Sequence, residues 1–347
     1  MKKLFSFVFA FFVLVGICSA NGQKMNIDYE SKRNLYGDFV IIPMDNTVTV
    51  TDGCITIAPK REDVTYTISG YFNGQIVNKT KNTVLKLKNV FIENNKGEAA
   101  IYGFAKTEIS TSRGTENYII STGSSDLKNA AIQCKKNLEI GGSGTAYVVG
   151  EVYHGVKGDD VKFKGSGVYY IQGTESGSTV NCHSFIAEKE KSFKLYMLNS
   201  KNGIKADNTI MIESGNFYSY NNETAFKTDT LADNPAEKHG IFISNGSIRV
   251  HKNEKVFDTE EKIFIPPSNT IDLGCARYVN QIGMELLTCG SLEYRTKAEK
   301  VLATVKYPQD VLGFPQAPRE RHFLFAKPFL LRLRSQKKRR QAHTTFS

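Results

Sequence analysis

Short alternating segments fill the middle of the chain, with apolar and polar residues taking turns and glycine-centred turns between them. They read VLKLKNVFI from Val84, IYGFAKTEIST from Ile101, LEIGGSGTAYVV from Leu138, VKFKGSGVYYI from Val161, FKLYML from Phe193, IMIESGNFYSY from Ile210 and IFISNGSIRV from Ile241. Alternation with a period of two is typical of β-strands that bury one face, whereas an amphipathic helix repeats about every 3.6 residues. The pattern therefore predicts an all-β fold of short strands and tight turns.

The turns that precede several of these segments share a motif. It reads GVKGD at Gly155–Asp159, GIKAD at Gly203–Asp207 and AFKTD at Ala225–Asp229. TVNC at Thr179–Cys182 begins halfway between the starts of the first two copies, and AIQC at Ala131–Cys134 precedes the first copy by the same interval. The chain is therefore expected to repeat with a period of about 24 residues.

A unit of this length, with two or three short strands and no helix, cannot bury its apolar face alone and has to stack on copies of itself. The arrangement that fits is a coil in which each turn pairs in parallel with the next, about 4.8 Å away. The pattern therefore predicts a single-stranded parallel β-helix with turns of ~24 residues. A propeller and a sandwich are the alternative folds, but both need mostly antiparallel strands.

When the repeats stack, equivalent residues of successive repeats line up in columns, and some of these columns point inward. An apolar column and a column of small residues are expected, formed by Ile132, Val156, Val180, Ile204 and Phe226, and by Cys134, Gly158, Cys182, Ala206 and Thr228. Cys134 and Cys182 would lie two turns apart, about 9.6 Å by the strand spacing, which exceeds the roughly 7 Å limit for a disulfide. We therefore expect both thiols to be free, and Cys275–Cys289 is the remaining candidate bridge.

One outward column is aromatic. Four tyrosines and an arginine take the same outward place in successive turns, namely Tyr147, Tyr170, Tyr196, Tyr218 and Arg249. A polysaccharide could lay its pyranose rings on this surface, because one sugar unit is close in length to the strand spacing of about 4.8 Å. The rings could instead stack only to stabilise neighbouring strands. The sequence leaves both interpretations open.

A second outward column combines lysines with aspartates, namely Lys157, Lys205 and Lys227 with Asp159, Asp160, Asp207 and Asp229. Because Asp207 and Asp229 fall on adjacent turns, we expect their carboxylates about 5 Å apart, which suits a shared Ca²⁺. A carboxylated sugar could bind through this ion or through the lysines. The alternative is a solvated face whose charges neutralise each other at under about 1 kcal/mol per pair.

Several motifs carry a family resemblance: TISG at Thr67–Gly70, GQIV at Gly74–Val77, NTVLKLKNVFIENNKGEAAIYG from Asn82, and the recurrent Gly-(Ile/Val)-Lys-x-Asp turns. From about Val48 to Phe257 the chain resembles the bacterial carbohydrate-binding parallel β-helix family of secreted proteins, relatives of pectate lyases. The resemblance implies a right-handed helix, binding of polysaccharides such as cellulose or polygalacturonate, and calcium. The family's Asp-bearing turns correspond to Asp159, Asp207 and Asp229.

Enzymatic cleavage of the same polymers is a second function class. Pectate-lyase chemistry uses Ca²⁺ to acidify the proton beside a uronate carboxylate, and a Lys or Arg of lowered pKa to remove that proton. The column lysines have the right type, but neighbouring carboxylates are expected to raise their pKa. The six histidines are scattered and expected at the surface. We therefore assign no catalytic residue and favour a non-catalytic carbohydrate-binding protein, with a calcium-dependent lyase and a structural surface adhesin as alternatives.

The two ends of the chain differ from the repeats. Lys2 and Lys3, an apolar run and then Cys18-Ser19-Ala20 predict a secretory signal cleaved after Ala20, and hence an extracellular or cell-surface location. The predicted divisions are a signal peptide at 1–20, cap strands at 21–60, a carbohydrate-binding β-helix at 61–262, a small β region at 263–312 and a basic, unstructured tail at 313–347. An alternating stretch that turns at Asp52-Gly53 predicts a hairpin over the open end of the stack.

The expected partner depends on where the charged residues lie along the chain and not on their total. The 347 residues carry 45 Lys and Arg against 35 Asp and Glu, and the formal charge of +10 is typical of nucleic-acid binders. The tail holds nine basic residues against Glu320, and Lys2 and Lys3 supply the rest of the excess, so the repeats are neutral. This favours a polysaccharide over nucleic acid. No apolar run reaches the roughly 18 residues of a transmembrane helix, and we expect a monomer.

Overall fold

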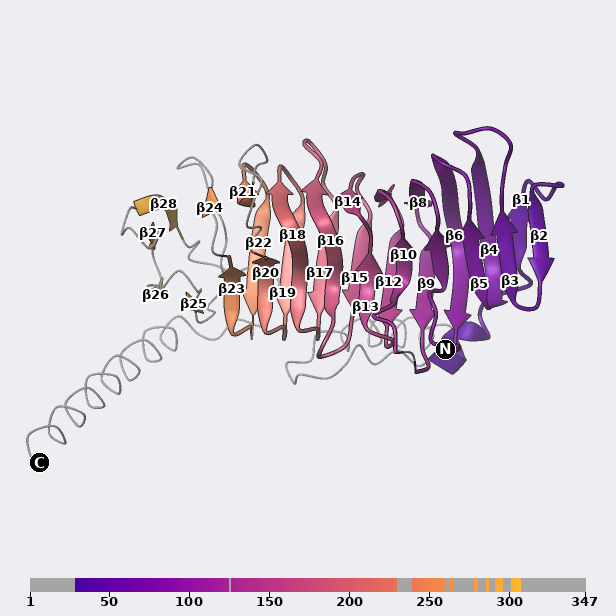
Figure 1. The fold of residues 1–347 in the computed structure, drawn as a ribbon, viewed down its shortest axis with the longest axis horizontal. Helices are drawn as coiled ribbons and strands as arrows, with labels where there is room; N and C mark the ends of the chain where they lie inside the picture. The colour runs from indigo at the N-terminus through magenta and orange to yellow at the C-terminus, as the bar shows by residue number, and fades with distance from the viewer. Residues whose placement is uncertain are drawn as a thin grey trace, which may run out of the picture.

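The protein is all-β, as the alternation predicts. The computed structural model describes residues 29–124, 126–229, 239–251, 253–259, 263–264, 278–279, 285–286, 291–295 and 301–306. Within these ranges there is one short helix, α2 (Tyr29–Arg33), and strands β1 to β24 join into a single sheet. Figure 1 shows these strands side by side along the long axis of the molecule. The predicted signal peptide and basic tail lie outside the described residues.

Parallel strands form three ladders. The first contains β3 (Cys54–Ile57), β5 (Gln75–Asn78), β7 (Ile101–Gly103), β10 (Ala130–Cys134), β13 (His154–Lys157), β16 (Ser178–Ala187), β18 (Asn202–Ile212), β20 (Thr224–Thr228) and β23 (Lys255–Asp258). The second contains β4 (Thr65–Asn73), β6 (Thr83–Asn94), β8 (Thr107–Thr111), β11 (Leu138–Gly142), β14 (Asp160–Phe163), then β16 and β18 again, β21 (Gly240–Ile243) and β24 (Ile263–Phe264). The third starts from the ends of β4 and β6 and continues through β9 (Glu116–Ser121), β12 (Thr145–Gly150), β15 (Val168–Gln172), β17 (Lys194–Leu198), β19 (Asn216–Tyr220) and β22 (Ser247–His251). The chain visits the ladders in turn and returns to the first one rung further along.

The spacing between rungs shows where the repeat is regular. Along the first ladder Ile132 pairs with Val156, Val156 with Val180 and Val180 with Ile204, and these three steps along the chain are equal. The chain therefore advances by a constant step over these rungs. The step from Ile101 to Ile132 is longer and the step from Ile204 to Phe226 is slightly shorter. The longer step includes the connection between β9 and β10, which lies outside the ladders.

The predicted inward columns lie in the core. All five residues of the apolar column are buried and belong to one hydrophobic cluster that runs from Ile41 to Ile263. Each such side chain contributes roughly 1.5–3 kcal/mol when fully buried. The core therefore forms a continuous rod between the three ladders, and the outward side chains of each ladder are left for other roles.

The column of small residues marks a tight corner, as predicted. A Cβ on Gly103 would lie 2.8 Å from the Sγ of Cys134 and 2.5 Å from the Oγ1 of Thr107, both too close for a real contact. Cys134 and Cys182 are buried and free, and β13 separates their strands. The candidate partners Cys275 and Cys289 lie outside the described residues.

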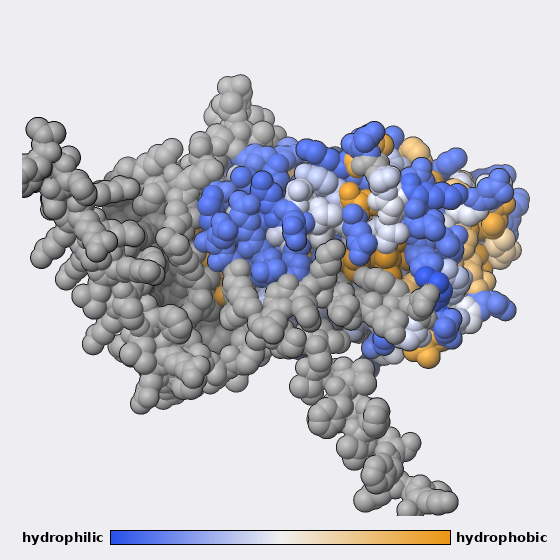
Figure 2. Space-filling view, turned by 90° about the horizontal axis from the view of Figure 1, so that it is seen from below, coloured by the Kyte–Doolittle hydropathy of each residue, from blue (hydrophilic) through white to orange (hydrophobic). Residues whose placement is uncertain are grey.

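Antiparallel strands close the N-terminal end of the stack. β2 (Val48–Thr51) pairs with β3 in a hairpin whose turn residues Asp52 and Gly53 have φ values of 34° and 72°, as a primed hairpin turn requires. β1 (Val40–Ile42) pairs antiparallel with β4. The exposed apolar side chains of Ile42 and Val50 lie on these cap strands, and Figure 2 shows apolar surface at that end of the molecule. The predicted capping hairpin is thus confirmed.

The C-terminal strands depart from the ladders. β25 (Tyr278–Val279) pairs with β26 (Glu285–Leu286), and β27 (Ser291–Arg295) pairs with β28 (Val301–Lys306), both antiparallel. None of the helices in the described part of the chain is long and apolar enough to span a membrane. The predicted domain boundaries stay predictions.

Candidate functional site

The predicted tyrosines share one row on the third ladder. Tyr147 pairs with Tyr170, Tyr170 with Tyr196, Tyr196 with Tyr218 and Tyr218 with Arg249, so all five occupy one position in successive rungs. Their neighbours along the strands point into the core, as the alternation requires. The register predicted for this row is confirmed.

The row is longer than the sequence indicated. Tyr147 also pairs with Tyr118, Tyr118 with Phe91 and Phe91 with Tyr71, which adds three aromatic residues toward the N-terminus. The steps along the chain from Phe91 to Tyr118 and from Tyr118 to Tyr147 are both longer than the regular step of the repeat. The repeated turn motif begins at Ala131 and does not extend back to these two rungs, although the alternation around Tyr118 was available as a signal. We call the eight residues from Tyr71 to Arg249 the tyrosine row.

From Phe91 to Tyr218 the rings of the tyrosine row stack face to face, whereas the Tyr71 ring is tilted by 53° to that of Phe91. Ring centroids from Tyr118 to Tyr218 are 4.7, 5.0, 4.5 and 4.4 Å apart in successive pairs, with interplanar angles of 11°, 7°, 13° and 9°. The ends are covered as well, because the guanidinium of Arg249 lies 5.4 Å from the Tyr218 ring centroid and that of Arg33 lies 5.6 Å from the Tyr71 ring centroid.

This geometry decides what the tyrosine row offers to a ligand. A sugar ring that stacks on an aromatic ring needs an open face, and from Tyr118 to Tyr218 each face meets another ring or a guanidinium group. Ring edges and phenol hydroxyls are what remain toward solvent. The stacking therefore favours the second interpretation of these residues, which is stabilisation of neighbouring strands.

The segment after the N-terminal helix covers the first part of the row. The Tyr36 ring packs edge-on against Phe91 at 5.7 Å and against Tyr118 at 6.0 Å, and its hydroxyl donates to the Glu116 carbonyl at 3.1 Å. Arg33 of α2 forms an ion pair with Glu93 at 2.9 Å. Phe91 and Tyr118 are buried as a result. Burial also raises the pKa of the Tyr147 phenol to about 12, so this hydroxyl stays protonated at neutral pH.

The predicted lysines share a row on the first ladder, together with two amides. In register along the ladder, this lysine row reads Tyr102, Gln133, Lys157, Asn181, Lys205, Lys227 and Asp258. All three predicted lysines are present, and Asn181 stands in the turn that lacks the lysine. A row of ammonium and amide groups can hydrogen-bond a polar polymer along the length of the stack.

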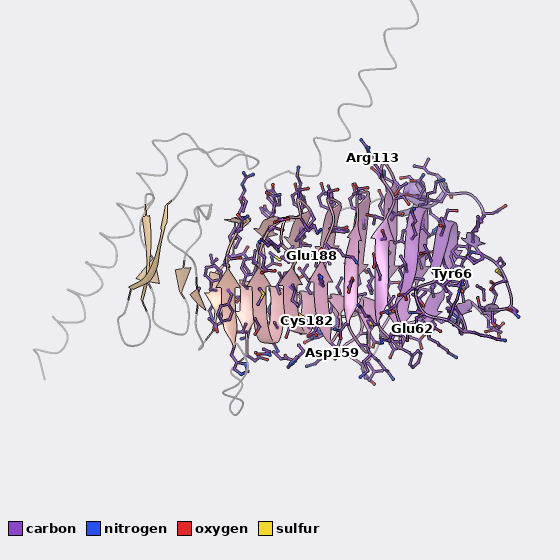
Figure 3. All side chains as sticks on the ribbon, turned by 90° about the horizontal axis from the view of Figure 1, so that it is seen from above. Glu62, Tyr66, Arg113, Asp159, Cys182 and Glu188 are labelled. Atoms are coloured by element: carbon purple, nitrogen blue, oxygen red, sulfur yellow. The ribbon has the colours of Figure 1, made fainter. Side chains whose placement is uncertain are left out.

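A second row lies two residues further along each strand and contains the predicted aspartates. By position along the strands, this aspartate row reads Phe104, Lys135, Asp159, His183, Asp207 and Asp229. Ladder hydrogen bonds place Lys135 beside Phe104 and Asp229 beside Asp207, because Lys135 N donates to Gly103 O at 2.8 Å and Asp229 N to Ala206 O at 3.1 Å, while His183 N donates to Asp159 O at 2.7 Å. Figure 3 shows Asp159 at one edge of the stack and Arg113 at the opposite edge.

Ion pairs divide the lysine row into two parts. Lys205 Nζ lies 2.7 Å from Asp229 Oδ2, and Lys227 Nζ lies 3.1 Å from Asp258 Oδ2, so these two ammonium groups are neutralised. Lys157 instead donates to the Lys128 carbonyl at 3.0 Å. Burial, followed by the ammonium of Lys128, lowers the pKa of Lys157, and the charge of Asp207 opposes them with a smaller effect. The prediction that carboxylates raise its pKa is wrong for this lysine.

The aspartates provide few ligands for a metal ion. Burial raises the pKa of Asp207, and Asp229 adds to this, so these two carboxylates lie within electrostatic reach of each other. Asp160 accepts a hydrogen bond from Asn137 at 3.2 Å, and Asp159 is exposed. Within the described ranges, no three His, Cys, Asp or Glu side chains gather as a metal-binding group. Since Ca²⁺ takes six to eight oxygen ligands, it would have to displace Lys205 from Asp229.

The histidine nearest this face is structural. His154 is buried, and its Nδ1 accepts a hydrogen bond from the Ser178 backbone N at 3.0 Å. Burial first, and then the ammonium groups of Lys157 and Lys205, lower its pKa to about 3. The expectation that every histidine lies at the surface is therefore wrong for His154, because β13 turns this side chain into the stack.

The outward face of the second ladder is occupied by ion pairs. Lys164 Nζ lies 2.8 Å from Glu108 and 2.6 Å from Glu139, while Lys106 Nζ lies 2.8 Å from Glu139. Burial alone would raise the pKa of Glu139, but hydrogen bonds and charge from Lys106 and Lys164 lower it to about 2. The charged side chains of this face therefore pair with one another, just as the rings of the tyrosine row stack on one another.

One comparison with known proteins agrees with the carbohydrate-binding part of the resemblance. A family model described as "Carbohydrate-binding domain-containing protein" matches residues 44–190. Among solved structures, the chain is similar to one titled "Structure of the polysaccharide lyase-like protein from C. thermocellum, Gadolinium derivative", at a TM-score of 0.45 and 18% identity, covering 69% of this chain and 89% of that chain. Comparison with curated proteins finds no match.

Proposed function

We propose that the protein is a secreted, non-catalytic binder of an extended polysaccharide, which it holds along the lysine and aspartate rows. The observation that carries the proposal is the family match at residues 44–190. That segment includes Tyr102, Phe104 and Lys157, where the outward groups of the first ladder are not neutralised by one another. Following the resemblance, the polymer is of the cellulose or polygalacturonate type.

The proposal includes the finer description of the fold. Three parallel ladders, visited in turn at a constant step in the regular part, support a single-stranded right-handed parallel β-helix. The hand follows from a general rule, because crossover connections between parallel strands are right-handed in about 98% of cases.

The geometry of the first ladder suits a linear polymer. Its rungs repeat at the strand spacing of about 4.8 Å, close to one sugar unit. Gln133, Lys157 and Asn181 offer an amide, an ammonium and a second amide on three consecutive rungs. Sugar hydroxyls both donate and accept hydrogen bonds, so an alternation of donor and acceptor groups is a suitable partner.

A polysaccharide pull-down tests the proposal. Wild-type protein is mixed with insoluble cellulose or with immobilised polygalacturonate, and the bound fraction is compared with that of the double variant Lys157→Gln/Asn181→Ala. We expect wild type to bind and the variant to bind at least about tenfold more weakly, since two hydrogen-bonding groups are lost. A Tyr170→Ala variant is the matched control on the tyrosine row and should bind like wild type. If Tyr170→Ala binds weakly and the double variant binds like wild type, the binding site lies on the tyrosine row instead.

Calcium assistance is a separate part of the proposal. Asp207 and Asp229 are the carboxylates that would hold the ion, together with Asp159 and Asp160 if the turns rearrange. The same pull-down in EDTA and in excess Ca²⁺ tests this point. Binding that falls in EDTA and returns with Ca²⁺ supports it, and equal binding in both conditions removes calcium from the proposal.

One observation favours a lyase as the second candidate. A catalytic base for this chemistry needs a lowered pKa, and Lys157 has one because of burial and Lys128. An ultraviolet absorbance assay for unsaturated uronate products distinguishes the candidates. Products formed by wild type and not by Lys157→Gln would make the protein a lyase. Binding without products supports the non-catalytic role, and absence of both would favour the adhesin.

Export is proposed from the first twenty residues, which lie outside the described part of the chain. Expression of the full chain in a bacterium with an intact secretion pathway, followed by N-terminal sequencing, tests it. We expect the mature protein to begin at Asn21. A product that still begins at Met1 and stays in the cytosol would contradict export.

A further inference from the structure

An exposed aromatic pair stands at one end of the two outward rows. Phe104 follows β7 directly and keeps 45% of its surface exposed, although it lies beside the ordered first ladder. The Tyr102 ring contacts it at 4.9 Å with an interplanar angle of 71°, so the two rings meet edge to face. The other large exposed apolar side chains in the described ranges are aliphatic. Phe104 thus presents an exposed ring directly after a strand of the first ladder.

This pair differs from the tyrosine row in how its ring faces are used. The only ring that contacts Phe104 in the described part of the chain is that of Tyr102. The Nζ of Lys135 lies 4.8 Å from the Phe104 ring centroid, but Lys135 is exposed and its long side chain is flexible. A cation–π contact at such an exposed site is weak. A ligand ring can therefore take the place of this ammonium group at little cost.

The lysines near the pair have no carboxylate partner. Among the described residues, no carboxylate forms an ion pair with Lys128, Lys135 or Lys157, in contrast to Lys205 and Lys227 further along. Lys128 lies over the Tyr153 ring at 5.5 Å, and its carbonyl accepts the bond from Lys157. Repulsion between Lys128 and Lys157 contributes to the lowered pKa of Lys157. A bound anion would relieve this repulsion.

The neighbouring positions supply groups for hydroxyls. Gln133 lies between Tyr102 and Lys157 in the lysine row. Asp159 is exposed, and its backbone N donates to the carbonyl of Lys136, the residue after Lys135, at 3.2 Å. Over three rungs the surface therefore offers an aromatic ring, two unpaired ammonium groups, an amide and a carboxylate, which together match a sugar ring, its acid group and its hydroxyls.

We propose that Tyr102, Phe104 and Lys135 form an aromatic subsite that stacks one sugar ring and pairs the carboxylate of that sugar, with Lys157 contacting the next unit. The inference rests on the proposed polysaccharide binding. It adds that one end of the bound stretch of polymer lies at Tyr102 and Phe104. It also assigns the aromatic contact to the first ladder instead of to the tyrosine row. None of these three residues repeats in the turn motif, which is why the sequence pattern did not reveal them.

Affinity measurements with two polymers that differ in charge test the subsite. Polygalacturonate and its fully methyl-esterified form are titrated against the full chain and against Phe104→Ala, Phe104→Tyr, Lys135→Gln and Val50→Ala. Val50 is the matched control, because it is an apolar residue with 54% exposure on the cap hairpin, whose strand β3 lies two rungs before β7. Thermal unfolding midpoints establish that each variant is folded.

The expected pattern separates the two parts of the subsite. Phe104→Ala should weaken binding of both polymers about three- to tenfold, whereas Phe104→Tyr keeps the stacking ring and should restore it. Lys135→Gln should weaken binding of the charged polymer about tenfold and leave the esterified polymer unchanged, because only the charged polymer carries the anion. Val50→Ala should bind like wild type.

Other outcomes overturn the inference in distinguishable ways. If wild type binds and Phe104→Ala binds equally well, the aromatic subsite is wrong while the proposed function stands. If Lys135→Gln weakens both polymers to the same extent, the carboxylate contact is wrong. If wild type binds neither polymer nor cellulose, the proposed function fails and the subsite fails with it.

Discussion

The tyrosine row and the lysine row are built on the same repeating backbone, yet their side chains behave in opposite ways. In the tyrosine row each ring is covered by the next, at centroid distances of 4.4–5.0 Å from Tyr118 to Tyr218. In the lysine row the residue type changes at every rung from Tyr102 to Lys205, so Lys157 has no like partner to stack on and no carboxylate to pair with. When one residue type repeats at the strand spacing, its side chains can contact one another from rung to rung. When the residue type varies, side-chain groups remain available to a ligand.

The ion-pair face of the second ladder extends this comparison. Lys106, Lys164, Glu108 and Glu139 alternate in sign and neutralise one another across three rungs. Two of the three outward faces are therefore occupied by contacts within the protein. The first ladder, from Tyr102 to Lys157, is the face on which aromatic, cationic and amide groups remain available.

Removal of a buried ring from the tyrosine row should have the largest effect. Tyr118→Ala is expected to lower the free energy of unfolding by about 3–5 kcal/mol, because Tyr118 is buried between Phe91 and Tyr147 and the change leaves a cavity. Chemical denaturation measures this loss. Polysaccharide affinity per folded molecule should not change, and a tenfold loss of affinity at unchanged stability would reverse the roles of the two rows.

The ion pairs on the outward face of the second ladder should make the stability of the protein depend on pH. The pKa of Glu139 is lowered from 4.5 to about 2 in the folded protein, so its stabilising contribution is present above pH 4.5 and is lost as pH falls toward 2. Glu139→Gln is expected to destabilise the protein by about 1–3 kcal/mol at neutral pH. The variant should also lose less stability than wild type between pH 4.5 and 2. Denaturant midpoints measured across this range check it, and identical pH profiles would contradict the assignment.

The sequence predicts part of this arrangement and not the rest, for physical reasons. Repeated turns of constant length place Ile132, Val156 and Val180 correctly, because register follows from side-chain alternation once the turn length is fixed. Tyr118 pairs with Tyr147 but lies before Ala131, where the repeated turns begin, so the repeat does not include it. The stacking of ring faces depends on side-chain rotamers, which alternation does not specify.

The charged residues show the same limit. Position in a column predicts that Lys157 and Lys205 are equivalent, and the register confirms that they share a row. Their partners differ because Asp229 lies beside Lys205, whereas the connection before β10 brings Lys128 beside Lys157. Contacts that come from a connecting segment are invisible to a repeat-based prediction.

This difference leads to a prediction for binding. Lys157→Gln should weaken polysaccharide binding about tenfold, whereas Lys205→Gln should weaken it less than about threefold, because Lys205 is already engaged by Asp229. Isothermal titration with the same polymer measures both variants. Each change should alter stability by no more than about 0.5–1 kcal/mol. Equal losses of affinity would show that ion pairing does not divide the lysine row.

The smallest effect is expected at the end of the tyrosine row. Arg249 covers the last ring, with its guanidinium 5.4 Å from the Tyr218 centroid. Arg249→Ala should therefore cost about 0.5–1 kcal/mol of stability through the lost cation–π contact. Arg249→Lys, which keeps a cation, should recover part of that loss. Both variants also uncover the Tyr218 face, so polysaccharide affinity should stay the same or rise slightly. A fall in affinity for Arg249→Ala, with Arg249→Lys like wild type, would mean that this arginine contacts the polymer and that the tyrosine row ends in a binding site after all.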